Sequence, residues 1–145
     1  MAKHMSKLTH NRIISKLGKL DEYLGYLREI QKVNKADFVR DYRQYGLAER
    51  YLQLSIEILL DVSKQIITSN NLRQPLDNQD GFTVLVENKI ISEALTSDLV
   101  GISGFRNILV HEYENIDRSL VYDRLIKRLE TFSNFQKEIS KYLQD

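Results

Sequence analysis

Hydrophobic residues recur every three or four positions along most of the chain, which is the spacing of one side of an α-helix. The first such series consists of Ile13, Leu17, Leu20, Leu24 and Leu27. It predicts an amphipathic helix over residues 9–33, which Asn34 and Lys35 interrupt. A second series predicts a helical segment over residues 36–68, either as one helix kinked at Gly46 or as two nearly collinear helices.

The rest of the chain predicts further helices separated by polar breaks. The clearest loop covers residues 69–80 and contains Pro75, the only proline of the chain. A short helix is expected over residues 82–88, and Ser92 can cap a longer helix that continues through Tyr113. Asp117 can cap the last helix. The pattern therefore predicts a single all-α domain over residues 1–145, an antiparallel bundle of four to five helices.

Composition narrows the classes of function. The chain of 145 residues has the size of one domain, and its formal net charge of +1 gives no overall attraction to nucleic acid or membranes. The lack of cysteine excludes disulfides, thiolate zinc sites and cysteine nucleophiles, and it suits a reducing cytoplasm. No apolar run approaches the roughly 20 residues that cross a bilayer, and the N-terminus lacks the apolar core of a signal peptide. Residues 1–5 resemble a cloning remnant and are assigned no function.

The segment Gly104–Tyr113 concentrates the candidate chemistry of the chain. Its polar members are an arginine, an amide, a histidine and a phenol: Arg106, Asn107, His111 and Tyr113. On a straight helix each residue advances by about 100°, so these four side chains would share one broad polar side. Ile108 and Leu109 would then point toward the core.

These residue types suit a reaction on a phosphodiester. Arg106 keeps its charge and can bind phosphate oxygens in pairs, whereas His111 titrates near neutrality and can move a proton when a ribose 2′-hydroxyl attacks phosphorus. Asn107 can orient either of them. Such scission needs no metal, and the segment offers no set of metal ligands. It does need both an acid and a base, and His111 is the only histidine beyond the N-terminal region, which points to a homodimer with a second His111.

Each of these residues also has a structural explanation. An arginine and a histidine five positions apart occur in many proteins by chance. His111 can simply bond a carbonyl at a helix crossing, and Tyr113 can be a tyrosine at the edge of the core. Composition and spacing leave the structural and the catalytic interpretation open.

The segment Gly104–Tyr113 resembles the signature of HEPN-domain proteins, specifically of the HepT-like toxin family: Arg-Asn, several residues, His, any residue, Tyr. The likeness extends over most of the chain. Residues 48–57 and 60–62 look like that family's second helix, and positions 116–117 and 121–122 after the motif also fit. The motif itself matches without departure.

The resemblance implies an all-α homodimer that acts as a metal-independent endoribonuclease and needs no cofactor. By that likeness Arg106 and His111 are the catalytic pair, and Asn107 supports them. The implied partner is a minimal nucleotidyltransferase (MNT) that serves as antitoxin and transfers AMP from ATP to Tyr113. Two alternatives stay open, namely a non-catalytic HEPN module that docks a nucleotidyltransferase or a nucleotide, and an interaction-only helical dimer.

Basic residues outside the motif are candidates for RNA contacts. One group is Arg40, Arg43 and Arg50, interleaved with tyrosines, and another begins at Arg118 and continues with Arg124, Lys127 and Arg128. Nearby acidic residues favour a solvated, salt-bridged surface as the alternative. Asp61 interrupts an apolar run and is expected either to pair with Arg106 or to lie at the solvent edge.

Overall fold

A computed structural model describes residues 5–112 and 115–145 of the chain. The described helices are α1 (Lys7–Ile30), α2 (Lys35–Arg40), α3 (Tyr42–Ser69), α4 (Asp80–Glu87), α5 (Glu93–Asp98), α6 (Ile102–His111) and α7 (Arg118–Gln144). No strand occurs in these residues. The predicted all-α class is therefore confirmed, although the bundle has more helical segments than the four to five predicted.

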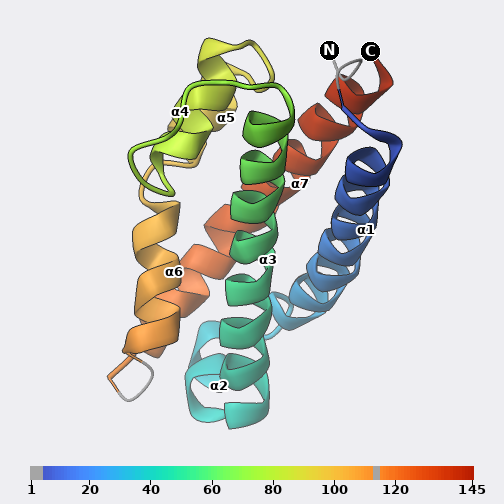
Figure 1. Ribbon diagram of the computed structural model, residues 1–145. Coiled ribbons are helices and arrows are strands. Elements are labelled where there is room, and N and C mark those ends of the chain that lie inside the picture. Colours follow the sequence, from blue (N-terminus) through green and yellow to red (C-terminus); the bar gives the residue numbers. More distant parts are fainter. Residues whose placement is uncertain (1–4, 113–114) are drawn as a thin grey trace.

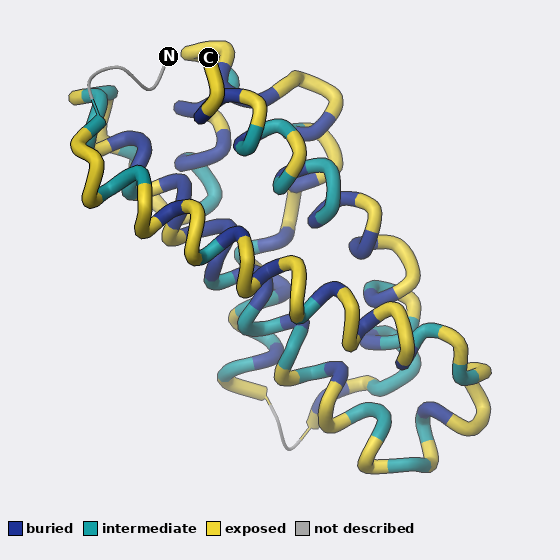
Figure 2. The backbone as a smooth tube through the Cα atoms, turned by 90° about the vertical axis from the view of Figure 1, so that its right-hand side faces the viewer, coloured by how far each residue is buried: buried dark blue, intermediate teal, exposed yellow. Residues whose placement is uncertain are grey.

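Helix α3 lies at the centre of the molecule (Figure 1). It packs against α1 on one side and α6 on the other, while α7 crosses behind it and contacts both α1 and α3. The short helices α4 and α5 lie at one end and α2 at the other. Buried positions recur along the inner sides of the long helices, as Figure 2 shows, because the apolar residues follow the helical repeat.

Polar side chains fix where most helices begin. Ser6, Asn34, Asp41, Ser92 and Asp117 each accept a hydrogen bond from a backbone N–H in the first turn that follows. These bonds satisfy donors that have no partner inside a helix. The predicted caps at Ser92 and Asp117 are confirmed, and so is the loop predicted over residues 69–80, which covers residues 70–79 between α3 and α4.

Two predicted helices are interrupted in the structure. The segment 36–68 breaks at Asp41, whose backbone is extended and which caps α3, whereas α3 continues through Gly46 without a break. The helix predicted from Ser92 to Tyr113 is also divided, because α5 ends at Asp98 and α6 begins at Ile102. Gly101 between them has φ +82°, a conformation that favours glycine. The prediction of one continuous helix was wrong here.

The turn between α5 and α6 is held by two side chains from distant elements. The Gln79 amide donates to the Leu99 carbonyl at 2.8 Å and accepts from the Ser103 N–H at 3.1 Å. Arg128 of α7 donates to the carbonyls of Asp98 and Val100. Helix α6 has no side-chain cap of its own, so Gln79 and Arg128 fix its start.

Candidate active site

Helix α6 carries the described part of the motif on its outer side. Ile102, Phe105 and Leu109 are buried and attach the helix to the core. The Asn107 and His111 side chains are exposed to solvent, and the Arg106 side chain is half-buried. The predicted division of this helix into a core side and a polar side is therefore confirmed.

The Arg106 guanidinium contacts α3. Its Nη2 lies 3.4 Å from Oε2 of Glu57, and its Nη1 donates to Oδ1 of Asn107 at 3.3 Å. Glu57 also accepts from the Gln53 amide, one turn earlier on α3, at 3.0 Å. The Arg106 and Glu57 side chains are 28% and 32% exposed, so the pair lies at the edge of the solvent. A cation is thereby held in a defined place beside an amide.

The acidic partner of Arg106 was not identified from the sequence. Of the two alternatives for Asp61, the solvent edge is confirmed and the pair with Arg106 is not, because Asp61 is exposed and pairs with Lys16 of α1 at 3.4 Å. Glu57 lies one turn earlier and on the side of α3 that meets α6. The sequence carries no signal that favours Glu57 over Asp61, because both are acids on the same helix one turn apart.

His111 is the last residue of α6 and is exposed. Within residues 5–112 and 115–145 its imidazole has no hydrogen bond or ion pair, so a bond to a carbonyl at a helix crossing is not seen there. The predicted helix through Tyr113 is too long, since α6 ends at His111 with Glu112 as its cap. Tyr113 itself lies outside the described residues.

The four predicted RNA contacts do not form one cluster. Arg118 has its guanidinium carbon 4.0 Å from the centre of the Tyr45 ring, a cation–π contact between α7 and α3. Arg43 pairs with Asp41, with Nε 3.1 Å from Oδ1. Arg50 is exposed on α3.

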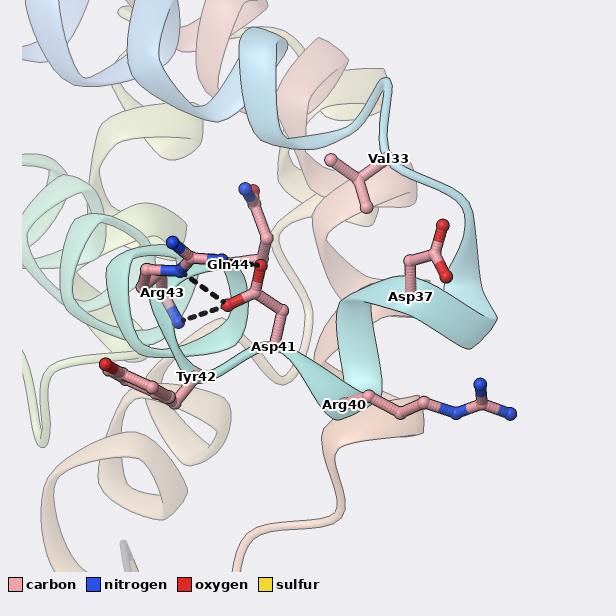
Figure 3. A pocket seen from close by; sticks show the side chains of 7 residues that line it. All are labelled: Val33, Asp37, Arg40, Asp41, Tyr42, Arg43 and Gln44. Atoms are coloured by element: carbon pink, nitrogen blue, oxygen red, sulfur yellow. Dashed lines mark hydrogen bonds and ion pairs between the residues drawn. The ribbon is translucent and has the colours of Figure 1, made fainter.

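The Arg40 side chain points away from Arg43 and Asp41, as Figure 3 shows. All three residues line an open hollow of about 720 Å³ at the junction of α2 and α3. Arg106, Asn107 and His111, the motif residues that the structure describes, do not line this hollow, so it is separate from the described part of the candidate active site.

Arg128 does not belong to the predicted basic series. Arg128 is only 3% exposed, and its two terminal nitrogens donate hydrogen bonds to the carbonyls of Asp98 and Val100. Its role is therefore structural. In the described residues no three His, Asp or Glu side chains gather as a set of metal ligands. Among the described helices, none combines the length and low charge content that a bilayer-crossing segment needs.

The model of a known family matches residues 20–139 of the chain, and its description is "Ribonuclease HepT-like". The chain belongs to the HepT-like family. The match covers all the helices from α2 to α6, the second half of α1 from residue 20 onward and most of α7, including the outer side of α6. Membership therefore applies to the whole fold that positions Arg106 and His111.

Two relatives within the HepT-like family are nucleases by name. The tRNA nuclease HepT of Aphanizomenon flos-aquae is 27% identical over 131 residues, which cover 90% of this chain and 89% of the relative. The mRNA nuclease HepT of Shewanella oneidensis is 29% identical over 111 residues, covering 75% and 84%.

A solved structure extends the likeness to three dimensions. It is the tri-AMPylated Shewanella oneidensis HEPN toxin in complex with MNT antitoxin. It matches this chain with a TM-score of 0.80 and 25% identity, over 94% of this chain and 99% of that one. The resemblance to the HepT-like family that the motif indicated is confirmed.

Proposed function

We propose that this protein is the toxin of a HEPN/MNT toxin–antitoxin pair and an endoribonuclease that works without a metal ion. The observation that carries the proposal is the outer side of α6, where Arg106, Asn107 and His111 face outward from a core-bound helix. Membership in a family described as ribonuclease HepT-like supports it, and so do the two relatives named as nucleases.

The chemistry follows from the residue types. A ribose 2′-hydroxyl attacks the adjacent phosphorus and loses its proton, while the leaving 5′ oxygen gains one. His111 can take the first proton or give the second, because its imidazole is exposed and histidine is the side chain that most often acts as a general acid or base. Arg106 stabilises the charge that develops on the phosphate oxygens, and Asn107 orients the guanidinium through its Oδ1.

The second proton-transferring group comes from a homodimer in this proposal. Leu47, Arg50 and Leu54 follow at helical spacing on the outward side of α3, and Leu54 precedes Glu57 by three residues. Leu47 is 50% exposed and offers apolar surface for a second copy on this side of the helix. We place the contact between the two copies on this side of α3, where it brings a second His111 toward the first.

Regulation in this proposal uses a cognate nucleotidyltransferase as antitoxin. The similar toxin of Shewanella oneidensis is AMPylated and bound to its MNT antitoxin, which supports a corresponding modification of Tyr113. Tyr113 follows His111 by two residues, so added phosphates would compete for Arg106 and the nucleotide would block the RNA. Action on cellular RNA, and the lack of cysteine, support a cytoplasmic location.

The phosphates of the RNA on either side of the cleaved bond would contact basic side chains of the protein. Arg50 lies on the same side of α3 as the proposed dimer contact, and Arg118 lies over Tyr45 near the start of α7. Arg40 and Arg43 lie at the α2–α3 junction, where Arg43 must exchange Asp41 for a phosphate. We propose all four as phosphate contacts.

The test is RNA cleavage in excess EDTA by protein made in cells that lack the nucleotidyltransferase. The mass of the Tyr113 peptide must first show an unmodified tyrosine. His111→Ala and Arg106→Ala are each expected to lower the cleavage rate by about 10²-fold or more, the range for a lost proton-transfer or charge-stabilising group. His10→Ala and Arg28→Ala on α1 are the matched controls and should cleave like the wild type.

Either of two results would contradict the proposal. Intact RNA with unmodified wild-type protein across varied substrates would favour a HEPN module that only binds. Cleavage that survives both α6 substitutions would mean that the active site lies elsewhere or that a contaminant is responsible.

A further inference from the structure

Only some of the hydrogen-bond donors of Arg106 have partners within the described residues. A guanidinium has five N–H donors: one on Nε and two on each terminal nitrogen. Nη2 donates one hydrogen bond to Glu57, and Nη1 donates one to Asn107. Nε is buried and has no hydrogen-bond partner among the described residues. Each terminal nitrogen therefore keeps one N–H that can donate to a phosphate oxygen.

We propose that Glu57 is a positioning residue that fixes the Arg106 guanidinium for the phosphate. The proposal rests on the ribonuclease function above and adds a residue to its site. An arginine at the edge of the solvent has many rotamers, and ordering it during the reaction is unfavourable. Glu57 orders it beforehand through the 3.4 Å contact to Nη2.

The anchor is itself fixed. The Gln53 amide donates to the same oxygen, Oε2 of Glu57, at 3.0 Å from the same side of α3. Helix α3 is the central helix of the bundle and contacts five of the other described helices. The Glu57 carboxylate therefore holds the Arg106 guanidinium in a fixed position relative to the core of the bundle.

Stabilisation of the fold is a poor explanation for the pair. The two side chains are 28% and 32% exposed, and ion pairs at such positions contribute little to the free energy of unfolding. Asp61 provides a direct comparison on the same helix. It forms an ion pair of the same length, 3.4 Å, with Lys16, but on the side that faces α1. Asp61→Ala is therefore a matched control for Glu57→Ala.

The first experiment is steady-state RNA cleavage by the wild type, Glu57→Ala, Glu57→Gln and Asp61→Ala. Glu57→Ala is expected to lower kcat on the order of tenfold to a hundredfold, because the guanidinium loses its orientation. KM should not rise, since a negative charge beside the phosphate site is removed. Glu57→Gln should recover part of kcat through its amide oxygen, and Asp61→Ala should match the wild type. A wild-type kcat in Glu57→Ala, or an equal loss in Asp61→Ala, would overturn the proposal.

The second experiment does not use RNA. Nitrogen-15 spectra of the arginine side chains report rotation about the Nε–Cζ bond, and Arg106→Lys identifies the Arg106 signals by their loss. Slow rotation with separate Nη1 and Nη2 signals is expected in the wild type and Asp61→Ala, and faster, averaged signals in Glu57→Ala. Unchanged Arg106 signals in Glu57→Ala would overturn the positioning role. If the wild type does not cleave RNA, the proposed function fails, while this comparison still decides the role of Glu57.

Discussion

Glu49 is a carboxylate in a partly buried place near Tyr45 and Arg118. One of its oxygens, Oε2, is buried and has no hydrogen-bond partner among the described residues. Burial raises the pKa of Glu49 above its ordinary value of 4.5, and the positive charge of Arg118 opposes that shift more weakly. At neutral pH the folded protein therefore holds this carboxylate in a form that its surroundings disfavour.

Glu49→Gln is expected to raise Tm at pH 7 by about 1–2 °C, because it removes a charge that folding partly desolvates. The sign follows from the raised pKa. The unfolded chain ionises first as pH rises, so the penalty is complete above the raised pKa and absent below the ordinary one. Thermal unfolding followed by circular dichroism at pH 7 and near pH 4 should show the gain and then its loss. Glu130→Gln, at an exposed site on α7, is the control, and a lower Tm for Glu49→Gln at pH 7 would contradict this account.

At the scale of residues, the sequence could predict the types in the site but not their partners. Arg106, Asn107 and His111 were recognisable from the motif alone. The choice between Glu57 and Asp61 depends on which side of α3 faces α6 and which faces α1. That is a property of packing, and two acids one turn apart give no indication of it. Arg128 shows the same limit, because its charge suggested the surface while its carbonyl partners place it inside.

The junction of α5 and α6 is decided by a single backbone conformation and its supporting bonds. Leu95, Leu99 and Ile102 are all buried and keep the helical spacing across the break, so the apolar pattern shows no interruption. A glycine at position 101 is the local feature that permits the break, because the backbone there has a positive φ. By contrast, the break at Asp41 leaves a capping residue at the start of α3, and the loop after Ser69 carries obvious helix breakers. The loop after Ser69 was predicted from these breakers, whereas the break at Asp41 was missed in favour of a kink at Gly46, although its capping residue was visible in the sequence.

Arg128→Met is expected to lower the free energy of unfolding by about 3 kcal/mol, since two charge-assisted bonds are lost and two carbonyls at the α5–α6 junction lose a donor. Urea denaturation measures this difference. Lys127→Met, at the exposed neighbouring position, is the control and should stay within about 0.5 kcal/mol of the wild type. Equal stability of the two variants would mean that Arg128 does not hold the α5–α6 turn against α7.

The whole molecule is organised so that the catalytic candidates lie on one helix while their support comes from others. Helix α6 contacts α3 along its length, its first turn is held by Gln79 before α4, and the preceding turn is held by Arg128 of α7. A helix of ten residues is not stable alone in water, so its orientation belongs to the complete fold. The proposed dimer extends this dependence to a second copy.

Leu47→Asp is expected to convert the proposed dimer to a monomer, because a charge would be buried in the contact between the two α3 helices. Size-exclusion chromatography with light scattering gives the mass directly. RNA cleavage should fall together with the mass, since each site loses the second His111. Leu76→Asp is the control, at a leucine that is 91% exposed in the loop between α3 and α4. A monomeric wild type, or a dimeric Leu47→Asp, would show that the contact lies elsewhere or is absent.

The hydrogen bonds from the buried Arg128 side chain to the α5–α6 turn also affect when the motif helix can be fixed during synthesis of the chain. A ribosome releases the motif before it releases α7, so a growing chain has Arg106 and His111 outside well before the residue that holds their helix. A growing chain in which only the motif has emerged therefore lacks the bonds that hold the turn before α6, and the orientation of Arg106 and His111 depends on a helix that is made later.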